Sequence, residues 1–501
     1  MSRHPHPEVD VERQLPPRGL PRAGERSRRC RTAWRHRFWS AKRGARGGTR
    51  RGVRGGTGES WARRTGGPWS HRAAGPWPRT AIGPWPHTAA GPWGRFRSLL
   101  TEPSGLRTAG AALTALVALA ATSLVAGPAL AEPHIGPCAL ERSSAHHSEG
   151  VASWNDAYPR PLGRQRAVMV FLSFPDATPR TAPKALTRDY FPATSRFYAR
   201  ASYGRFHLGV DPRPKWIEMP HSSTSYAIER DWAAAHRSAY LRDALAAADP
   251  EVDFSRYDLV YFVADPDAPG VDSDATKVVN FDRPLHADGT DIGRVVTVFE
   301  KHPPDRNVLA HETGHVYDLP DLYHRPADGK GDWDTYVGDW DVMGSQFGLA
   351  PDFFGWHKWK LGWLGDDQVT CVQEAGPARL TLEPLSAPDP ATGTRLAVVR
   401  TGEDSAVALE ARTATGNDAD VCEEGVLVYR VRSGVSSGGG PVKVYDSHPG
   451  TGACQDASVQ SGLADAPVKT GETFTVPGTH VKVAVEGRDA SGGWTVQVTT
   501  A

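Results

Sequence analysis

The stretch HETGHVYDLPD, residues 311–321, decides how the chain is interpreted. Its two histidines are four residues apart, so on a helix both side chains project from one face, a turn apart. Two imidazoles at this spacing can bind one zinc ion, and Glu312 then lies beside them as a general base for a water molecule. Because HExxH fixes only three positions, a chance match on an ordinary surface helix is the competing interpretation. The third ligand has to decide between the two.

The residue expected to be the third zinc ligand is an aspartate. No glutamate occurs between Glu312 and Glu374, which excludes a downstream helical glutamate over this region. The extended pattern HExxHxxGxxH turns sharply after the helix and returns a ligand six residues beyond the second histidine. That position is Asp321, and a carboxylate oxygen is an ordinary zinc ligand. The turn position is Asp318 instead of glycine, and aspartate tolerates the left-handed conformation better than most residues.

A methionine turn beneath the histidines is a further expectation for such a site. The chain has 4 methionines, and Met343 follows Asp321 by 22 residues in GDWDVMGSQ. A methionine followed by Gly-Ser suits a tight turn. Ordinary filling of the core is the alternative interpretation of a single methionine.

Together these residues resemble the M6 family of secreted metallopeptidases, the immune-inhibitor-A type, within the metzincin group. The matching segments are AVMVFLSFPD, SRFYARASYGRFHL, VDFSRYDLVYFVAD, HETGHVYDLPDLY, GDWDVMGS, WHKWKLGWL and ALEARTATGNDADVCEEGVLVYRV. The resemblance covers roughly residues 165–435 and departs from the family pattern at Asp318. It implies that Glu312 is the general base and that one catalytic Zn²⁺ is bound by His311, His315 and Asp321.

The resemblance also implies Ca²⁺ sites, for which two acidic loops are candidates. One loop holds Asp265, Asp267, Asp272 and Asp274, and the other holds Asp328, Asp332 and Asp334. Neither has the spacing of an EF-hand, and acidic loops are usually just solvated. Three residues near the zinc motif are candidates for stabilising an oxyanion, although such residues more often have a supporting or surface role: Tyr323, His324 and Tyr336.

The charge of the chain is divided between two parts of opposite sign. All 501 residues together carry a formal net charge of +1. Residues 1–131 hold 23 lysines and arginines against 6 acidic side chains, which leaves 35 basic and 51 acidic side chains for residues 132–501. Parts so different in charge are not expected to act as one functional body.

Residues 1–106 are expected to lack a packed core. They are rich in Arg, Gly, Pro and Trp, and the tripeptide GPW recurs at Gly67, Gly75, Gly83 and Gly91. An RNA- or membrane-binding arm is one interpretation of arginine with interleaved tryptophan. The preferred one is low-complexity sequence upstream of the true translation start, so we expect no nucleic-acid partner.

A secretory signal peptide is expected at residues 107–131. Arg107 precedes an apolar, alanine-rich segment that ends in Ala129-Leu130-Ala131, an order typical of cleavage before Glu132. A lasting transmembrane anchor is the alternative, because the segment is nearly long enough to span. The small-residue ending disfavours it, so we expect an acidic, extracellular protein without a stable membrane anchor.

Four cysteines follow the expected cleavage point: Cys138, Cys371, Cys422 and Cys454. In an exported chain this number favours two disulfides, with three pairings to choose from. Proximity in sequence favours Cys422–Cys454 together with Cys138–Cys371. A zinc–thiolate site is disfavoured, because no two of the cysteines are close in sequence.

Hydrophobic patterning divides the exported chain into three parts. Residues 132–165 are polar and are expected to form a lead-in or short pro-segment. In residues 166–365, buried apolar runs such as residues 167–174 alternate with helical segments such as residues 226–248, which predicts an α/β layer.

The hydrophobic pattern of the sequence changes in residues 366–501. Short alternating runs such as RLAVVR, AVALEAR, GVLVYRVR and WTVQVTT are separated by Gly, Pro, Asp and Ser, which predicts an antiparallel β-domain, most simply a sandwich. The expected fold class is therefore an α/β (α+β) metzincin-like zinc protease domain followed by an antiparallel β-sandwich-like domain.

Two classes of function follow from the sequence. The first is a secreted zinc endopeptidase that hydrolyses peptide bonds of extracellular proteins, with proteins or peptides as its partners. The alternative is a catalytically weak relative that acts as an extracellular binding module, and Asp318 is the feature that supports it. The enzyme is favoured by five residues that an inactive relative has no physical need to keep together: His311, Glu312, His315, Asp321 and Met343.

Overall fold

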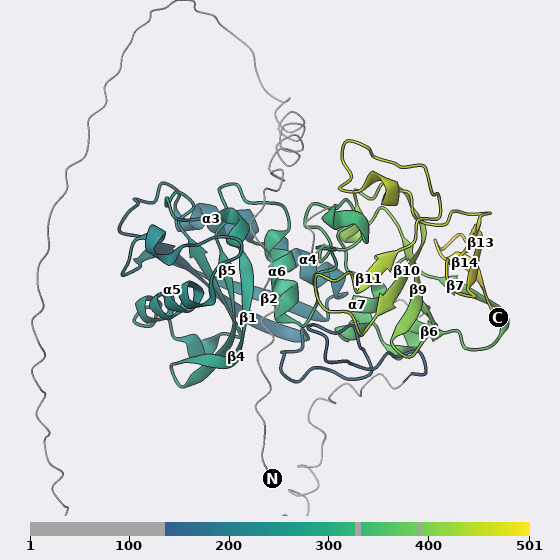
Figure 1. Cartoon of the computed structure of the whole chain (residues 1–501), viewed down its shortest axis with the longest axis horizontal. Helices are drawn as coiled ribbons and strands as arrows, with labels where there is room; N and C mark the ends of the chain where they lie inside the picture. Colours follow the sequence, from purple (N-terminus) through teal and green to yellow (C-terminus); the bar gives the residue numbers. More distant parts are fainter. Residues whose placement is uncertain (1–135, 326–331, 389–392) are drawn as a thin grey trace, which may run out of the picture. The chain divides into compact units, whose positions relative to one another are not determined.

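A computed structural model describes residues 136–325, 332–388 and 393–501 of the chain (Figure 1). The expected arginine-rich segment and the signal peptide lie outside the described residues, as does Asp328. The described residues belong to one unit with a mixed α/β architecture and three β-sheets. None of the helices in these ranges is long and apolar enough to cross a membrane.

The first sheet is built around the apolar run at residues 167–174. Its five strands are, in spatial order, β2 (Phe206–Glu218), β1 (Gly163–Ser173), β3 (Leu259–Ala264), β5 (Thr290–Val298) and β4 (Lys277–Ala287). The first four are mutually parallel, and β4 pairs antiparallel to β5 at the edge. The expected alternation of strands and helices, which predicted an α/β layer, is confirmed.

Side chains of β1 alternate between two hydrophobic cores. Met169 and Phe171 pack into the core on one face of the sheet, whereas Val168 and Val170 pack into the core on the other. A strand buried on both faces is typical of a parallel sheet that helices cover on both sides.

Helices cover both faces of this sheet. One face is covered by α5 (Ala234–Ala248), whose Tyr240 and Leu241 are buried against it. The helices on the other face are α3 (Pro183–Tyr190), α4 (Ala193–Ala201) and α6 (Val308–Val316), whereas α7 (Gly355–Lys360) lies beside the second sheet and bonds to Glu410 and Tyr429 there (Figure 1). Short 3₁₀ turns connect the elements: η1 (Ser223–Tyr226), η2 (Phe254–Arg256), η3 (Ser273–Ala275), η4 (Trp333–Thr335), η5 (Asp366–Gln368), η6 (Gly416–Asp418) and η7 (Ser461–Leu463).

The helix expected at residues 226–248 is shorter than predicted and begins only at Ala234. Ala227 has a left-handed backbone, with φ of +46°, directly after the 3₁₀ turn. Trp232 is fully buried, and its indole N–H donates to the carbonyl oxygen of Tyr226 at 2.8 Å. Burial of this tryptophan holds the preceding residues in an irregular loop, so tertiary packing overrides the local helix propensity.

The edge strand β4 was not predicted from the sequence. It forms a hairpin with β5 through Asp288 and Gly289, which both have positive φ, of +50° and +72°. An Asp-Gly pair with two positive φ angles is the preferred two-residue hairpin turn. That dipeptide was the usable signal for the strand.

The second and third sheets contain the alternating runs of the carboxyl-terminal part. The second sheet has the order β11 (Val442–Val444), β10 (Gly425–Arg432), β9 (Ser405–Arg412), β8 (Leu396–Arg400) and β6 (Val369–Cys371). The third has the order β12 (Thr473–Thr475), β13 (Lys482–Arg488), β14 (Trp494–Thr500) and β7 (Gly376–Leu382). The third sheet is wholly antiparallel, as expected. The second departs from the expectation, because β6 pairs in parallel with β8.

The second sheet lies between the core of the first sheet and the core of the third sheet. On one face, Leu396 and Val398 of β8 belong to the same core as Met169 of β1 and the helices α4, α6 and α7. On the other face, Ala397 packs into a separate core with Val496 of the third sheet. The layers therefore follow one another continuously from the first sheet through the helices to the two carboxyl-terminal sheets.

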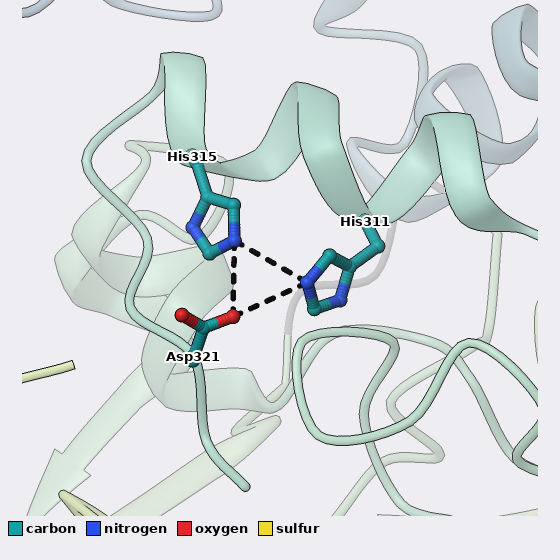
Figure 2. Close-up of side chains that lie close together, drawn as sticks. All are labelled: His311, His315 and Asp321. Carbon is teal, nitrogen blue, oxygen red and sulfur yellow. Dashed lines mark hydrogen bonds and ion pairs between the residues drawn. The ribbon is translucent and has the colours of Figure 1, made fainter. Parts of the chain in front are cut away.

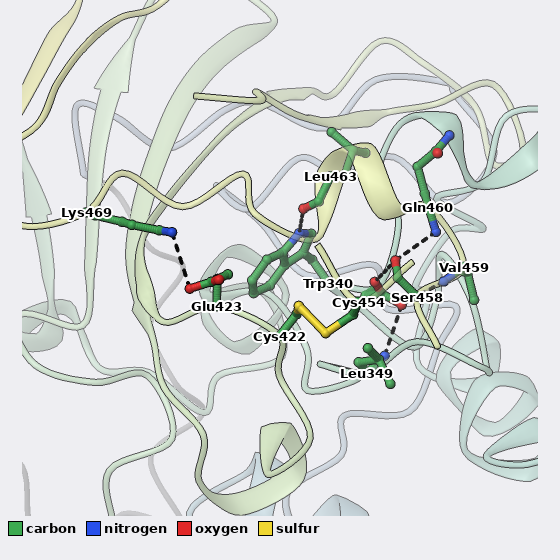
Figure 3. The surroundings of a disulfide bond; sticks show 11 residues. Trp340, Leu349, Cys422, Glu423, Cys454, Ser458, Val459, Gln460, Leu463 and Lys469 are labelled. Carbon is green, nitrogen blue, oxygen red and sulfur yellow. Dashed lines mark hydrogen bonds and ion pairs between the residues drawn. A yellow bond between two sulfur atoms is a disulfide. The ribbon is translucent and has the colours of Figure 1, made fainter. Parts of the chain in front are cut away.

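Both expected disulfides are present, Cys138–Cys371 and Cys422–Cys454. Figure 3 shows the second of them beside Trp340, whose indole N–H donates to the carbonyl oxygen of Leu463 at 2.7 Å. The bridge thus ties the chain before β10 to a long loop that folds over Trp340.

Replacing Cys422 and Cys454 together by serine is expected to lower the free energy of unfolding by about 2–4 kcal/mol. The bridge closes a loop with a sequence separation of 32 residues, and opening it gives the unfolded chain more conformational freedom. Urea unfolding of the oxidised wild type and of the double variant measures the difference. An unchanged unfolding midpoint would contradict this role.

Candidate metal centre

The helix α6 presents His311 and His315 on one face, as their spacing predicted. After the helix the chain turns at Asp318, which has φ of +61°, and brings Asp321 back towards the histidines. The Nε2 atoms of the two histidines are 3.3 Å apart. Each lies close to Oδ1 of Asp321, at 3.2 Å from His311 and 3.1 Å from His315 (Figure 2).

This triangle of donors fits a zinc ion. A tetrahedral zinc with ligands at ~2.0–2.1 Å places those ligands roughly 3.3–3.4 Å apart, close to the three distances found here. Two imidazoles and one carboxylate are also the kind of three-ligand set that catalytic zinc sites use. Within residues 136–325, 332–388 and 393–501, no other group of three His, Cys, Asp or Glu has its donor atoms within 4.8 Å of one another.

Backbone carbonyls orient both histidines. Nδ1 of His311 donates to the carbonyl oxygen of Val342 at 2.8 Å, and Nδ1 of His315 donates to that of Leu319 at 2.7 Å. A carbonyl oxygen can only accept, so each Nδ1 carries a proton and a neutral ring presents the lone pair of its Nε2 to the centre. Such outer hydrogen bonds are a regular feature of histidines that bind metals.

A serine from the carboxyl-terminal part orients Asp321. Ser437, in the loop between β10 and β11, donates its hydroxyl to Oδ2 of Asp321 at 3.0 Å. The amide of Asp321 in turn donates to the same hydroxyl at 2.9 Å. Oδ2 is thereby engaged and Oδ1 faces the histidines. Sequence reasoning missed Ser437, since it lies 116 residues from Asp321 and no local pattern marks it.

Met343 is fully buried directly beneath α6. A Cβ atom built on Gly314 would lie 2.4 Å from the sulfur of Met343, so the glycine of HETGH gives the methionine its space. The carbonyl oxygen of Met343 accepts from the amide of Leu322 at 3.0 Å. The turn at Met343 therefore supports two parts of the site. Its side chain packs against the helix, and its carbonyl oxygen holds the segment that carries Asp321.

Glu312 is held against the edge strand of the first sheet. Its Oε2 accepts from the amide of Val278 in β4 at 2.7 Å, and only 8% of the residue is exposed. Burial raises the pKa of the Glu312 carboxyl above its usual value, although His311 and His315 oppose the shift. A carboxylate with a raised pKa is well suited to accept and return a proton near neutral pH.

The side chains of His311, His315 and Asp321, called the triad below, strongly affect one another's protonation. Burial lowers the pKa of His315, but Asp321 outweighs burial and raises it to about 9; the pKa of His311 is also raised. Burial opposes ionisation of Asp321, yet the two histidines hold its pKa well below the usual value. The triad without metal thus holds a proton that a metal ion would displace, because only unprotonated donors bind a metal.

The three candidates for stabilising an oxyanion have different surroundings. Tyr323 lies near Asp321, and burial together with that carboxylate raises the pKa of its hydroxyl well above the usual value. His324 and Tyr336 stack on each other, with ring centroids 4.6 Å apart. These two rings therefore pack together as a pair.

Among the described residues of the two acidic loops considered for calcium, no three carboxylates bring their oxygens within 4.8 Å of one another. In the first loop, Lys301 donates to the carbonyl oxygens of Pro266 and Val271, at 3.0 and 3.2 Å, and Asp274 forms an ion pair with Arg230 at 2.7 Å. In the second, Asp332 accepts from the amide of Asp334, which caps a 3₁₀ turn. These contacts give several residues of the two loops a local structural role.

Gly314→Ala is expected to lower the free energy of unfolding by about 1–3 kcal/mol, because the new methyl group overpacks against the buried Met343. Helix propensity alone would change stability in the opposite direction, by about 0.5–1 kcal/mol. Urea unfolding decides the sign. In the Gly314→Ala, Met343→Ala double variant the loss should be smaller than the sum of the two single losses. A stabilised Gly314→Ala protein would contradict the close approach.

Ser437→Ala is expected to weaken zinc binding by about 10–100-fold, since the hydroxyl that orients Asp321 is lost. Competition with a chromogenic chelator measures the zinc dissociation constant. The matched control is Ser491→Ala, which removes a similar serine–aspartate bond in the turn between β13 and β14. Equal affinities for the two variants would show that Ser437 does not support the ligand.

Comparison with known proteins adds no assignment to this geometry. No protein-family model matches the chain, and no curated protein matches its sequence. The case for a metal centre therefore rests on the triad and on the bonds that orient it.

Proposed function

We propose that the chain is a secreted zinc-dependent endopeptidase of the immune-inhibitor-A type, with proteins or peptides as substrates. In this proposal residues 166–365 form a metzincin-like domain and residues 366–501 a β-sandwich-like domain. The observation that carries the proposal is the convergence of His311, His315 and Asp321, each with an outer hydrogen bond that turns its donor atom inward. The two disulfides agree with export, because such bonds persist in oxidising compartments.

The proposed chemistry divides between the metal and the chain. A bound zinc ion would acidify a water molecule and polarise the substrate carbonyl. Glu312 is the general base: it takes the proton from the attacking water and then delivers it to the leaving amine. The hydrogen bond from the Val278 amide fixes Oε2 of Glu312, so Oε1 is the oxygen that accepts and returns the proton.

The edge strand β4 supports a peptide as the substrate. It lies at the end of the first sheet and carries the amide that holds Glu312. An edge strand offers backbone donors and acceptors to an extended peptide, which is a general mode of peptide recognition. A substrate chain paired there would lie beside the general base.

The alternative is a catalytically weak protein that serves as an extracellular binding module. Asp318 in the glycine position favoured it, since a strained turn would misplace Asp321. However, the side chain of Asp318 is 1% exposed and has several polar partners. The turn is therefore well supported, which favours the enzyme over the binding module.

Glu312→Gln is expected to lower casein cleavage by about 10²–10⁴-fold while zinc content stays at one ion per chain, because the general base is lost and the ligands remain. Cleavage by the wild type should also disappear with a chelator and return with zinc. The rate of casein hydrolysis and the zinc content of the purified protein are measured together.

Two outcomes would count against the proposal. A wild type that binds one zinc ion yet cleaves no protein would favour the binding module. A Glu312→Gln variant that cleaves as fast as the wild type would remove Glu312 from the mechanism.

A further inference from the structure

The segment from Cys138 to Leu162, called the strap below, is built into the fold instead of lying on its surface. The disulfide to Cys371 holds its start. Near its end the carbonyl oxygen of Pro161 accepts from the indole of Trp363 at 2.8 Å. Leu140 and Val151 of the strap belong to the main hydrophobic core. From sequence this region was expected to be a lead-in or a short pro-segment.

The strap supports the turn that orients His315. Nδ1 of His147 lies 2.9 Å from Oδ1 of Asp318, and both residues are almost fully buried. Both also have left-handed backbones, with φ of +53° and +61°. Asp318 directly precedes Leu319, whose carbonyl oxygen orients His315. Strained residues of this kind persist only where the surrounding structure holds them.

A second connection leads from the strap to the turn that orients His311. Oε1 of Glu149 lies 2.8 Å from Nε2 of His357, and Nδ1 of that ring lies 2.9 Å from Oδ2 of Asp341. Oδ1 of Asp341 accepts from the amide of Met343 at 2.8 Å. The residue between them is Val342, whose carbonyl oxygen orients His311.

A third connection reaches the remaining ligand. The amide of Ser437 donates to the carbonyl oxygen of His146 at 3.0 Å, while its hydroxyl orients Asp321. The strap residues 146, 147 and 149 therefore each support the outer partner of a different donor of the triad.

The second connection is a fully buried chain of charges. The side chains of Glu149, His357 and Asp341 have no solvent exposure. Burial lowers the pKa of His357, but Glu149 and Asp341 outweigh it and raise the pKa to about 9. The ring is thus a cation between two anions at neutral pH. Removing the charge of Glu149 takes away one of the two anions that face His357 and also the carboxylate 3.9 Å from Lys360, so the buried charges lose part of their compensation.

We propose that residues 146–149 of the strap are a permanent brace of the metal centre, in which His147 and Glu149 are positioning residues for its histidines. This inference rests on the proposed function. It deepens that proposal, because it assigns the strap to the active protein and not to a pro-segment that is removed.

The test compares Glu149→Gln and His147→Phe with the wild type in the full-length chain. Glutamine keeps the shape of Glu149 without its charge, and phenylalanine keeps the ring of His147 without its hydrogen bond. The matched control is Glu141→Gln, the same substitution at an exposed position of the strap. Zinc affinity is measured by chelator competition, and the unfolding free energy of the zinc-free protein is measured beside it.

Both brace variants should raise the zinc dissociation constant of the folded protein about 10-fold or more, as loss of an outer partner does, and the control should match the wild type. Folded variants that are less stable but bind zinc like the wild type would overturn the brace, since the strap would then serve packing alone. In that case a wild type that still binds zinc and cleaves casein would leave the proposed function standing although the brace has failed. A wild type that binds no zinc would end both.

A second measurement does not depend on how the variants fold. Mass spectrometry of the zinc-loaded, active wild type identifies its amino terminus, which should lie before Cys138. An active, zinc-loaded species that begins after Pro161 would overturn the brace directly.

Discussion

The orientation of two imidazole rings is the constraint on which the rest of the structure depends. His311 and His315 present Nε2 to a common point only because each Nδ1 donates to a backbone carbonyl, of Val342 and Leu319. Those carbonyls lie in two separate turns, so both turns must be rigid. The packing of Met343 beneath Gly314 and the left-handed backbone of Asp318 are consequences of that requirement. If a ring rotated away from its carbonyl, nothing would fix its tautomer, and the lone pair of its Nε2 would no longer point at the centre.

The carboxyl-terminal sheets take part in the same rigidity. Arg412 of β9 is fully buried, with its guanidinium bonded to Glu410 and Asp418, both at 2.8–2.9 Å. The same guanidinium donates to the carbonyl oxygens of Trp340 and Ala350, on either side of the turn at Met343. Breaking a buried ion pair of this kind typically costs about 3–5 kcal/mol. The second sheet is therefore a fixed support of the candidate centre, and it also supplies the loop that carries Ser437.

The parts of the protein that local pattern controls were predictable from the sequence. The HExxH helix, the return of Asp321, the buried strand β1 and the runs that form β8, β9, β10 and β14 all follow from spacing or alternation. The two disulfides followed from proximity and an even cysteine count. The edge strand β4 was overlooked although its Asp-Gly turn was visible, and the start of α5 was misplaced because the burial of Trp232 lies outside local propensity.

The outer partners of the candidate centre were beyond the reach of such patterns. Ser437 lies 116 residues from Asp321, His147 lies 171 residues from Asp318, and Glu149 lies 208 residues from His357. Serine, histidine and glutamate are common in loops, so nothing local distinguishes these three. Only the packing of distant segments gives them partners, and that packing is a property of the whole fold.

Asp318 shows how a local departure becomes intelligible in this context. A glycine would adopt φ of +61° without steric cost, whereas a residue with a side chain loses roughly 1–2 kcal/mol there. Aspartate recovers that loss through its hydrogen bonds to His147 and Asn155, since a bond to a charged group contributes about 1.5–3 kcal/mol. Lys360 adds a bond to the Asp318 carbonyl oxygen at 2.6 Å. Because the strap supplies His147 and Asn155 to this carboxylate, the residue that first suggested a weakened site is one that couples the strap to it.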